Sequence, residues 1–454
     1  MNNRIHLNAF DMSCAGHQSP GLWRHPDDQG HRYTDLEYWV GLAQLLERGG
    51  FDSLFLADVL GIYDVYEDSR DAAVRQAAQV PVNDPILAVS AMAAATRHLG
   101  FAVTASVTYE HPYALARRMT TLDHLTKGRI GWNVVTSYLA SAAANLGLGR
   151  QIPHDERYDL AEEYLEVCYK LWEHSWTEDA VVRDRDRGVF TEPSGVRDIG
   201  HDGRYFSVPG AFLCEPSPQR TPVIFQAGAS RRGRVFAARH AEAVFVSGPT
   251  AEVVATLVRP LREEAAAAGR DPHAIKVFAQ ITPVVGETAA DAARKHASYL
   301  EHASREGALA LFGGWTGVDL AQSDPATPLT YVDNDATRTA LASFTTADPS
   351  RSWTPAELAE FLGIGGRGPV PVGSATDVAD ELERWVEVAD VDGFNIAYAV
   401  TPGTFEDFVE LVVPELRRRG RIPGEHGAGT LRQKLTGRDR LAADHPGSAY
   451  RDLD

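Results

Sequence analysis

A cysteine and a histidine lie three residues apart near the start of the chain, in the segment SCAGHQSPGLW. An imidazole beside a thiol can activate a cysteine nucleophile, because it removes the thiol proton. Cys14 and His17 are therefore candidates for covalent catalysis, but the sequence shows no third group that would orient the imidazole. We expect the two side chains to line a pocket instead.

The segment QAGASRRGR has the composition of an anion site. It follows a predicted strand and opens a predicted helix, so backbone N–H groups near Ser230 would face outward at the positive end of the helix dipole. Guanidinium groups of Arg231, Arg232 and Arg234 lie nearby in the sequence. An ordinary β-α turn with Ser230 as the helix N-cap explains the same residues, so both interpretations stay open.

His154 and Tyr158 open another predicted helix at positions i and i+4. Residues at this spacing share a helix face, so both side chains could reach the same anion. The alternative is a pair of exposed polar residues in the first turn.

Hydroxyl and amide side chains dominate the positions at which predicted strands end. They include Asn8, Thr104, Ser106, Asn133, Thr136, Ser137, Gln226, Ser247, Gln280, Thr282 and Asn395. The second strand ends at the carboxylate of Asp58. The set lacks the paired acids of glycosidases and any compact cluster of metal ligands. It suits hydrogen bonding to a planar heterocycle, and we expect no metal.

The elements that must position these residues alternate short apolar runs with longer amphipathic stretches, as in repeated β-loop-α units. Strands are predicted at 5–10, 53–57, 100–106, 130–135, 222–227, 243–247, 277–283 and 393–398. Helices are predicted at 36–48, 84–97, 114–125, 157–172, 232–239, 251–268, 375–388 and 404–419. The pattern predicts an α/β fold, a (β/α)8 TIM barrel, whose active site is built by the loops after the strands.

Two segments interrupt this alternation. Residues 174–217 are rich in Gly, Pro, Asp and Arg and end in a predicted small hairpin, and residues 313–373 have the composition of a mobile lid or loop. We expect one domain over 1–454 that contains both insertions and an irregular tail from about 424, which wraps the barrel or a partner subunit.

Composition narrows the classes of function. A formal net charge of −18 opposes attraction to nucleic acid and to anionic membranes, and no apolar run reaches the length of a membrane span. Three scattered cysteines and the absence of a visible secretory signal favour a cytoplasmic protein.

Six long motifs, in order from about residue 4 to 420, carry a resemblance to a known family. They are HLNAFDMSCAGHQSPGLWRHPDDQGHRYTDLEYW, LERGGFDSLFLAD, TLDHLTKGRIGWNVVTS, HDERYDLAEEYLEVCYKLW, SPQRTPVIFQAGAS and DGFNIAYAVTPGTFEDFVELVVPELRRRG. The chain resembles the bacterial luciferase-like, two-component flavin monooxygenases, in the branch of nitrilotriacetate monooxygenase component A and dibenzothiophene sulfone monooxygenase. Within that branch it looks most like the long-chain alkane monooxygenases.

The resemblance implies a homodimer or homotetramer that takes FMNH2 from a separate NADH-dependent flavin reductase and uses O2 to oxygenate a small organic molecule. By the same resemblance, one group of residues surrounds the flavin ring and ribityl chain: Asp58, Thr104, Asn133 and Ser137. A second group lies at the phosphate: His154, Tyr158, Gly228 and Ser230. Relatives often have a non-prolyl cis peptide bond before the matching acid, so we expect one between Ala57 and Asp58.

At the substrate site, some residues of the chain match those of the alkane enzyme and others differ from them. Cys14, His17, Tyr63 and Gln79 match residues that line the substrate site of the alkane enzyme. Tyr138 and Leu311 stand where that enzyme has histidines, so a long-chain alkane substrate does not transfer directly, and an organosulfur or other xenobiotic compound is equally open.

We expect His17 to hydrogen-bond or protonate a flavin peroxide, because imidazole titrates near neutral pH. Cys14, Tyr63 and Tyr138 would shape or polarise the site, with segment 313–373 closing over it. Three other functions stay open: an F420-dependent dehydrogenase on the same barrel, a non-catalytic flavin-binding protein, and a metal-dependent hydrolase.

Overall fold

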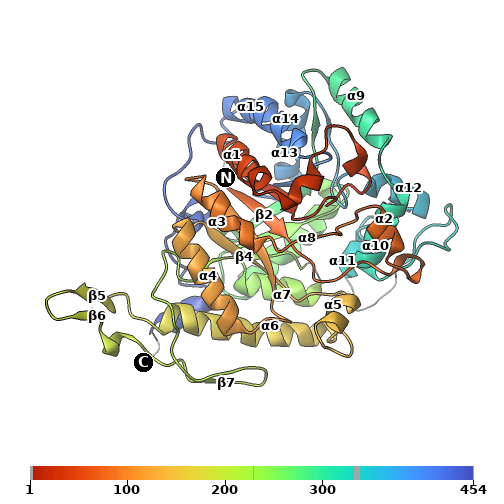
Figure 1. Ribbon diagram of the computed structural model, residues 1–454. Helices are drawn as coiled ribbons and strands as arrows, with labels where there is room; N and C mark the ends of the chain where they lie inside the picture. Colours follow the sequence, from red (N-terminus) through yellow and green to blue (C-terminus); the bar gives the residue numbers. More distant parts are fainter. Residues whose placement is uncertain (1–3, 229, 332–337, 453–454) are drawn as a thin grey trace.

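The computed structural model describes residues 4–228, 230–331 and 338–452. Eight parallel strands close into a barrel surrounded by helices (Figure 1). Around the barrel the strands follow the order β1, β2, β3, β4, β9, β10, β11 and β14, and β14 then pairs with β1. Their bounds are β1 His6–Met12, β2 Ser53–Ala57, β3 Gly100–Ser106, β4 Ile130–Val135, β9 Val223–Gln226, β10 Ala243–Val246, β11 Lys276–Ile281 and β14 Gly393–Ile396. The predicted (β/α)8 TIM barrel is confirmed.

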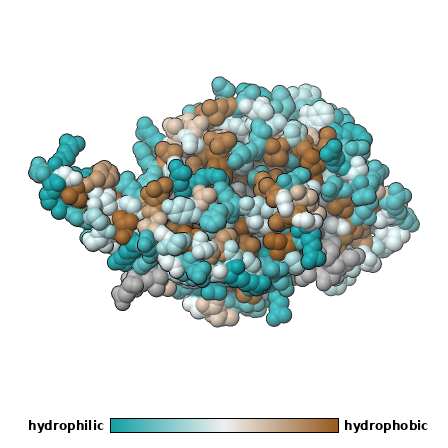
Figure 2. All heavy atoms as spheres, turned by 60° about the horizontal axis from the view of Figure 1, so that its bottom comes forward, coloured by the Kyte–Doolittle hydropathy of each residue, from teal (hydrophilic) through white to brown (hydrophobic). Residues whose placement is uncertain are grey.

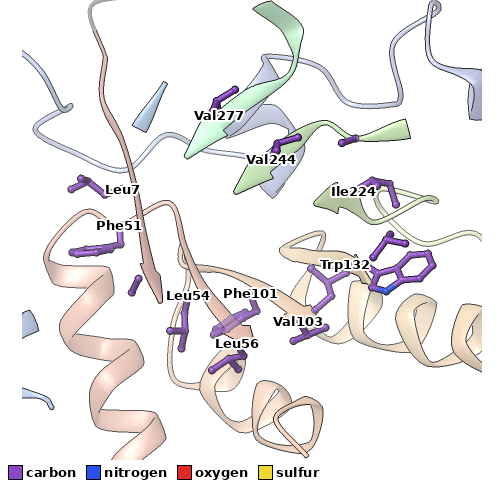
Figure 3. Close-up of a cluster of buried hydrophobic side chains, with 14 of the residues drawn as sticks. Leu7, Phe51, Leu54, Leu56, Phe101, Val103, Trp132, Ile224, Val244 and Val277 are labelled. Atoms are coloured by element: carbon purple, nitrogen blue, oxygen red, sulfur yellow. The ribbon is translucent and has the colours of Figure 1, made fainter. Parts of the chain in front are cut away.

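The barrel strands are short apolar runs that are buried on both faces. Side chains alternate along a strand, so one set fills the barrel and the next packs under the helices. Figure 3 shows the outer set, which includes Leu54, Leu56, Phe101, Val103 and Trp132. All eight strands were predicted from the sequence, and β2, β3 and β4 have the predicted bounds.

Phenylalanine rings form the inner set. Phe55 stacks on Phe245 with ring centroids 4.1 Å apart, and Phe10 stacks on Phe55 at 5.1 Å. Phe225 and Phe278 lie 5.4 and 5.9 Å from Phe245, again between ring centroids. Because these rings fill the middle of the barrel, the space open to a ligand begins above them, at the C-terminal ends of the strands.

Nine helices of the described chain cover the barrel wall. They are α1 Leu36–Arg48, α3 Ile86–Ala94, α4 Pro112–Thr126, α6 His154–Tyr169, α7 Arg231–His240, α8 Ala251–Ala267, α13 Ala375–Ala389, α14 Gly403–Asp407 and α15 Val413–Arg418. Short helices α2 Asp71–Arg75 and α5 Ala140–Asn145 lie in the loops after β2 and β4. Hydroxyl side chains cap several starts: Ser230 caps α7, Thr250 caps α8 and Ser374 caps α13, which satisfies N–H groups that the helices leave unpaired.

Segment 174–217 forms two small antiparallel hairpins. Their strands are β5 Val181–Asp184, β6 Val189–Thr191, β7 His201–Asp202 and β8 Ser207–Val208. The β5–β6 hairpin projects from the barrel at the left of Figure 1 and forms the arm at the left of Figure 2. The hairpin predicted at the end of this segment corresponds to β7–β8.

Segment 313–373 is more ordered than its composition indicates. After α9 Ala289–Leu300, it includes the end of α10 Arg305–Thr316, helices α11 Arg338–Ala342 and α12 Pro355–Leu362, and the short strand β13 Val372–Gly373, which pairs with β12 Val284–Val285. Trp353, Leu358 and Leu362 pack with Leu311 and Phe312 in a second hydrophobic cluster. The prediction of a loop was wrong for these residues, because the Pro- and Asp-rich stretches of the segment alternate with short amphipathic helices. Residues 332–337 lie outside the described ranges.

The tail after residue 424 closes the N-terminal end of the barrel. It contains α16 Leu431–Thr436, whose Leu431 and Leu435 pack with Phe225 of the barrel interior. Arg432 is fully buried and binds both carboxylate oxygens of Glu242, at 2.7 and 2.8 Å. The tail therefore wraps the barrel as predicted, but this part of it is helical and not irregular.

Within the described ranges, none of the helices combines the length and apolar character needed to cross a bilayer. The cis peptide bonds of these ranges are Val80–Pro81 and Thr401–Pro402. The cis bond expected between Ala57 and Asp58 is therefore absent, and both observed bonds precede proline, where the trans preference is weakest.

Candidate active site

A cavity with a volume of about 270 Å³ opens at the C-terminal ends of the barrel strands. All but two of the predicted site residues line it: His17, Asp58, Tyr63, Gln79, Thr104, Asn133, Ser137, Tyr138, His154, Tyr158, Gly228 and Ser230. The exceptions are Cys14 and Leu311. The loops after the barrel strands thus bring together residues that lie far apart in the sequence, as expected for this fold.

Phenylalanine rings and short polar side chains form the floor and one wall of the cavity. Phe10, Phe55 and Phe245 provide a flat apolar floor. On the wall, Nδ2 of Asn133 donates to Oγ1 of Thr104 at 3.0 Å. A flat ligand can therefore lie against the rings while its edge meets amide and hydroxyl groups.

Two amide oxygens on this wall are buried and accept no hydrogen bond from the described residues. Oδ1 of Asn133 and Oε1 of Gln226 have no hydrogen-bond partner among the described residues. A buried acceptor without a partner costs about 1–3 kcal/mol. A ligand that carries N–H groups would remove this cost, so the two oxygens indicate what the cavity binds.

Ser137, two residues after the end of strand β4, has an unusual backbone conformation, with φ of 55°. A left-handed conformation costs a non-glycine residue roughly 1–2 kcal/mol, so other contacts must hold it. Its Oγ donates to Oγ of Ser106 at 2.8 Å, and the buried guanidinium of Arg157 donates to its carbonyl oxygen. These contacts hold the polar edge of β4 against the cavity.

Asp58 provides the one carboxylate among the described residues that line the cavity. Burial, together with the negative charge of Asp84, raises the pKa of Asp58 to about 7. Near neutral pH this half-buried carboxyl group therefore exists in both its neutral and its charged form, and it can donate or accept a hydrogen bond.

One end of the cavity has the chemistry of an anion site. His154 and Tyr158 are buried, at 8% and 5% exposure, so the interpretation as exposed first-turn residues is wrong. Ser230 caps α7 by accepting from the N–H of Gly233 at 3.0 Å, as an ordinary β-α turn would. A Cβ on Gly228 would lie 2.6 Å from Oη of Tyr158. Glycine at this position thus keeps space between the phenol and the start of α7.

Tyr63 is the centre of a hydrogen-bonded group at the other end. Nε2 of Gln79 donates to the carbonyl oxygen of His17 at 3.0 Å, which turns Oε1 of Gln79 toward Tyr63. Tyr63 therefore donates its single hydroxyl proton to Gln79, at 2.8 Å, and accepts from Trp315 at 3.2 Å and from Tyr138 at 3.0 Å. This saturates its hydroxyl, so Tyr63 positions Tyr138 and has no proton left for a ligand.

His17 is buried, at 1% exposure, and its Nε2 lies 3.0 Å from Nε2 of Gln18. Burial lowers the pKa of His17 to about 3. The imidazole is therefore neutral at neutral pH, so the expected role as a proton donor there is not supported, whereas one ring N–H remains for a hydrogen bond.

Cys14 and Leu311 lie outside the cavity wall. The thiol of Cys14 donates to the carbonyl oxygen of Gly16 at 3.4 Å, and burial beside Asp11 raises its pKa, so it stays protonated and is not a nucleophile. Leu311 is fully buried in the second hydrophobic cluster. Trp315, one helical turn further along α10, reaches the cavity in its place.

Several lining residues were not predicted, among them the large polar or aromatic side chains of Gln18, Arg157, Trp315 and Arg367. Arg157 could have been found, because it lies three residues after His154 on the same helix face. Trp315 and Arg367 lie in the segment predicted to be a lid, whose composition gives no hint of their direction. In the described ranges, no group of three or more His, Cys, Asp or Glu side chains is placed to hold a metal ion.

Comparison with known proteins decides the family. The family model for luciferase-like monooxygenases matches residues 21–392. The chain belongs to this family. The predicted membership in the luciferase-like, two-component flavin branch is confirmed by relatives that match between 91% and 100% of the chain.

This luciferase-like monooxygenase is 55% identical to dimethyl-sulfide monooxygenase of Hyphomicrobium sulfonivorans, over 100% of the chain and 95% of the relative. It is 53% identical to long-chain alkane monooxygenase of Geobacillus thermodenitrificans (strain NG80-2), over 100% of the chain and 99% of the relative. A solved structure of long-chain alkane monooxygenase superimposes with a TM-score of 0.91, covering 99% of this chain and 100% of that one. Riboflavin lyase, solved with modified FMN and riboflavin, gives a TM-score of 0.92 at 39% identity, with coverage of 99% and 100%.

Proposed function

We propose that the chain is the oxygenase component of a two-component FMNH2-dependent monooxygenase, which transfers one atom of O2 to a small organic substrate. One observation carries the proposal: a single cavity joins a flat apolar floor and an amide wall to the buried side chains of His154, Arg157 and Tyr158 beside the start of α7. FMN has a planar ring system with N–H and carbonyl groups at its edge and a phosphate at the end of its side chain.

The residues present fit this cofactor. Asn133 and Gln226 offer buried acceptors for N–H groups of the ring. His154, Arg157 and Tyr158 offer donors to the phosphate, beside the positive end of the α7 dipole. The structural likeness to riboflavin lyase, solved with modified FMN, supports the same choice.

Bound FMNH2 would supply the electrons that activate O2. The residues of the chain would hold the cofactor, orient the substrate and exclude water. Neutral His17 would donate one hydrogen bond, and Asp58, with a pKa of about 7, would take up or release a proton at neutral pH. Tyr63 would hold Tyr138 at the substrate end through the contact of 3.0 Å.

The substrate candidates are a long-chain alkane and an organosulfur or other xenobiotic compound, because relatives are named for alkanes and for dimethyl sulfide. A separate NADH-dependent flavin reductase would supply FMNH2. The name of a relative with 34% identity, nitrilotriacetate monooxygenase component A, supports a system of several components. We also propose, on the family resemblance, assembly as a homodimer or homotetramer.

The test combines the purified chain with a flavin reductase, NADH, FMN and 18O2, and supplies hexadecane, dimethyl sulfide, dibenzothiophene sulfone or the anion hexanesulfonate in turn. We expect one labelled oxygen atom in the product of at least one substrate, formed only when both proteins are present. Oxidation of NADH to NAD+ with reduction of O2 to hydrogen peroxide alone, and every substrate intact, would speak for a non-catalytic flavin-binding protein. Reduction or oxidation that needs F420 in place of FMN would favour the deazaflavin alternative.

A further inference from the structure

A cation without a counter-charge lies at the substrate end of the cavity. Arg367 is half-buried, lines the cavity and lies over the ring of Trp315, with its Cζ atom 5.4 Å from the ring centroid. It makes no hydrogen bond or ion pair with any described residue, and the titratable groups that act on its charge are the phenols of Tyr63 and Tyr138. Other arginines of the described interior are hydrogen-bonded: Arg432 pairs with Glu242, whereas Arg129 and Arg270 donate to backbone carbonyl oxygens.

The loop around Arg367, GIGGRGP, is fixed on the barrel rim. Gly365 donates its N–H to Oγ of Ser19 at 3.0 Å and accepts at its carbonyl from Nε2 of Gln280 at 2.8 Å. On the other side of Arg367, the carbonyl of Pro369 accepts from the N–H of Thr282 at 3.0 Å. The loop is thus tied to the strand ends on both sides of the arginine.

Glycines make this close approach possible. A Cβ on Gly366 would lie 2.0 Å from Oε1 of Gln18, and a Cβ on Gly368 would lie 2.6 Å from the carbonyl oxygen of Gln280. The spacing G-x-G-x-x-G is also that of dinucleotide-binding loops, but those follow a strand and open a helix. Here the loop follows α12 and leads into β13. The glycines therefore press the loop against the rim, and Arg367 projects from it into the cavity.

Removing a charged guanidinium group from water in this position costs free energy unless a counter-charge or hydrogen-bond acceptors compensate for the lost hydration. Burial disfavours the charged form and lowers the pKa of Arg367, although the Trp315 ring face returns part of the lost stabilisation. The Tyr63 hydroxyl is already saturated, and the carboxylate of Asp58 forms no ion pair with Arg367. An anionic group on a bound ligand would therefore neutralise and stabilise this buried cation.

We propose that Arg367 receives the anionic head group of the substrate, a carboxylate, sulfinate or sulfonate, in the part of the cavity that Tyr63, Tyr138 and Trp315 line. The planar guanidinium donates two parallel hydrogen bonds to such an oxyanion. The apolar remainder of the substrate would lie along Leu139 and Ala142, which also line the cavity. This inference rests on the proposed function and narrows its substrate class to organic anions.

The test is calorimetric titration of the whole chain with three probes of equal chain length: hexanesulfonate, hexanoate and neutral 1-hexanol. Each probe is titrated into the protein with and without saturating FMN. The variants are Arg367→Met, which removes the charge, and Arg367→Lys, which keeps the charge but loses the planar fork. Arg305→Met is the matched control, because it removes an exposed guanidinium from the start of α10.

We expect Arg367→Met to weaken binding of both anions at least tenfold, Arg367→Lys to recover part of it, and Arg305→Met to match the wild type. Binding of 1-hexanol should be the same in all four proteins, and the melting temperature of Arg367→Met should be unchanged or higher. Equal anion affinity in the wild type and Arg367→Met overturns the inference. So does a loss of FMN affinity in Arg367→Met without a change for the anions, since the arginine would then belong to the cofactor site. Failure of the wild type to bind FMN, with anion binding still dependent on Arg367, would instead contradict the proposed function alone.

Discussion

Replacing Tyr158 with phenylalanine is expected to weaken the binding of FMN while leaving riboflavin binding almost unchanged. The hydroxyl is buried beside Gly228, with the side chain 5% exposed, at the start of α7. A hydrogen bond to a charged group contributes about 1.5–3 kcal/mol. Loss of one such bond to the phosphate should therefore raise the Kd of FMN about 10- to 150-fold. Riboflavin has the same ring but no phosphate, so its Kd should change by less than about twofold.

The assay is anaerobic titration of wild type and variant with each reduced flavin, followed by calorimetry. The ring of residue 158 should keep its packing on Phe236, now at 5.6 Å between centroids, because only an oxygen atom is removed. Tyr164→Phe is the matched control: it makes the same change on the same helix, at a buried hydroxyl that has no partner among the described residues and does not line the cavity. Equal effects of Tyr158→Phe on the two flavins, or no effect on either, would refute the assignment of this end of the cavity to phosphate.

Three further predictions address the cofactor cradle and the stability of the barrel. Gly228→Ala should lower the affinity for FMN in the same titration, because its Cβ would lie 2.6 Å from Oη of Tyr158; unchanged affinity would show that the space beside the phenol is not used. Asp11 is 1% exposed and burial raises its pKa from 3.8 to about 7, so the folded protein holds this proton more tightly than the unfolded chain and loses stability as the pH rises from about 4 to about 7. Over that range the free energy of unfolding of the wild type should fall by up to about 4 kcal/mol relative to that of Asp11→Asn, because three pKa units correspond to about 1.4 kcal/mol each. If urea denaturation gives a difference in unfolding free energy between the two proteins that does not change with pH, this prediction is wrong. Arg432→Met leaves Glu242 buried without its cation and should lower the free energy of unfolding by about 3–5 kcal/mol. The double variant Arg432→Met, Glu242→Gln should recover much of this loss. If the double variant recovers none of it, the loss of the ion pair is not the cause.

The barrel could be predicted because its strands are short apolar runs separated by long amphipathic helices. Strand ends then give the position of the polar residues, so the sequence predicts that Thr104, Asn133 and Gln226 lie at the rim, where the structure has them. Local capping rules likewise predicted Ser230 as the start of a helix. These features depend on neighbours in the sequence, which is why the sequence reveals them.

Other features depend on contacts between distant segments. The direction of Arg367 is set by glycines that approach Gln18 and Gln280 from more than 80 residues away in sequence, and the composition of its loop gives no sign of this. The low pKa of His17 comes from burial, which only the packed structure shows. The same is true of Leu311, whose position in a hydrophobic cluster leaves the cavity wall to Trp315.

The most direct test of the account is a crystal structure of the protein soaked with FMN. The account predicts a flavin ring above Phe10 and Phe55, its edge against Asn133, and its phosphate beside Tyr158 and Ser230 at the start of α7. A flavin bound elsewhere, or a cavity that stays without flavin at a saturating FMN concentration, would contradict it.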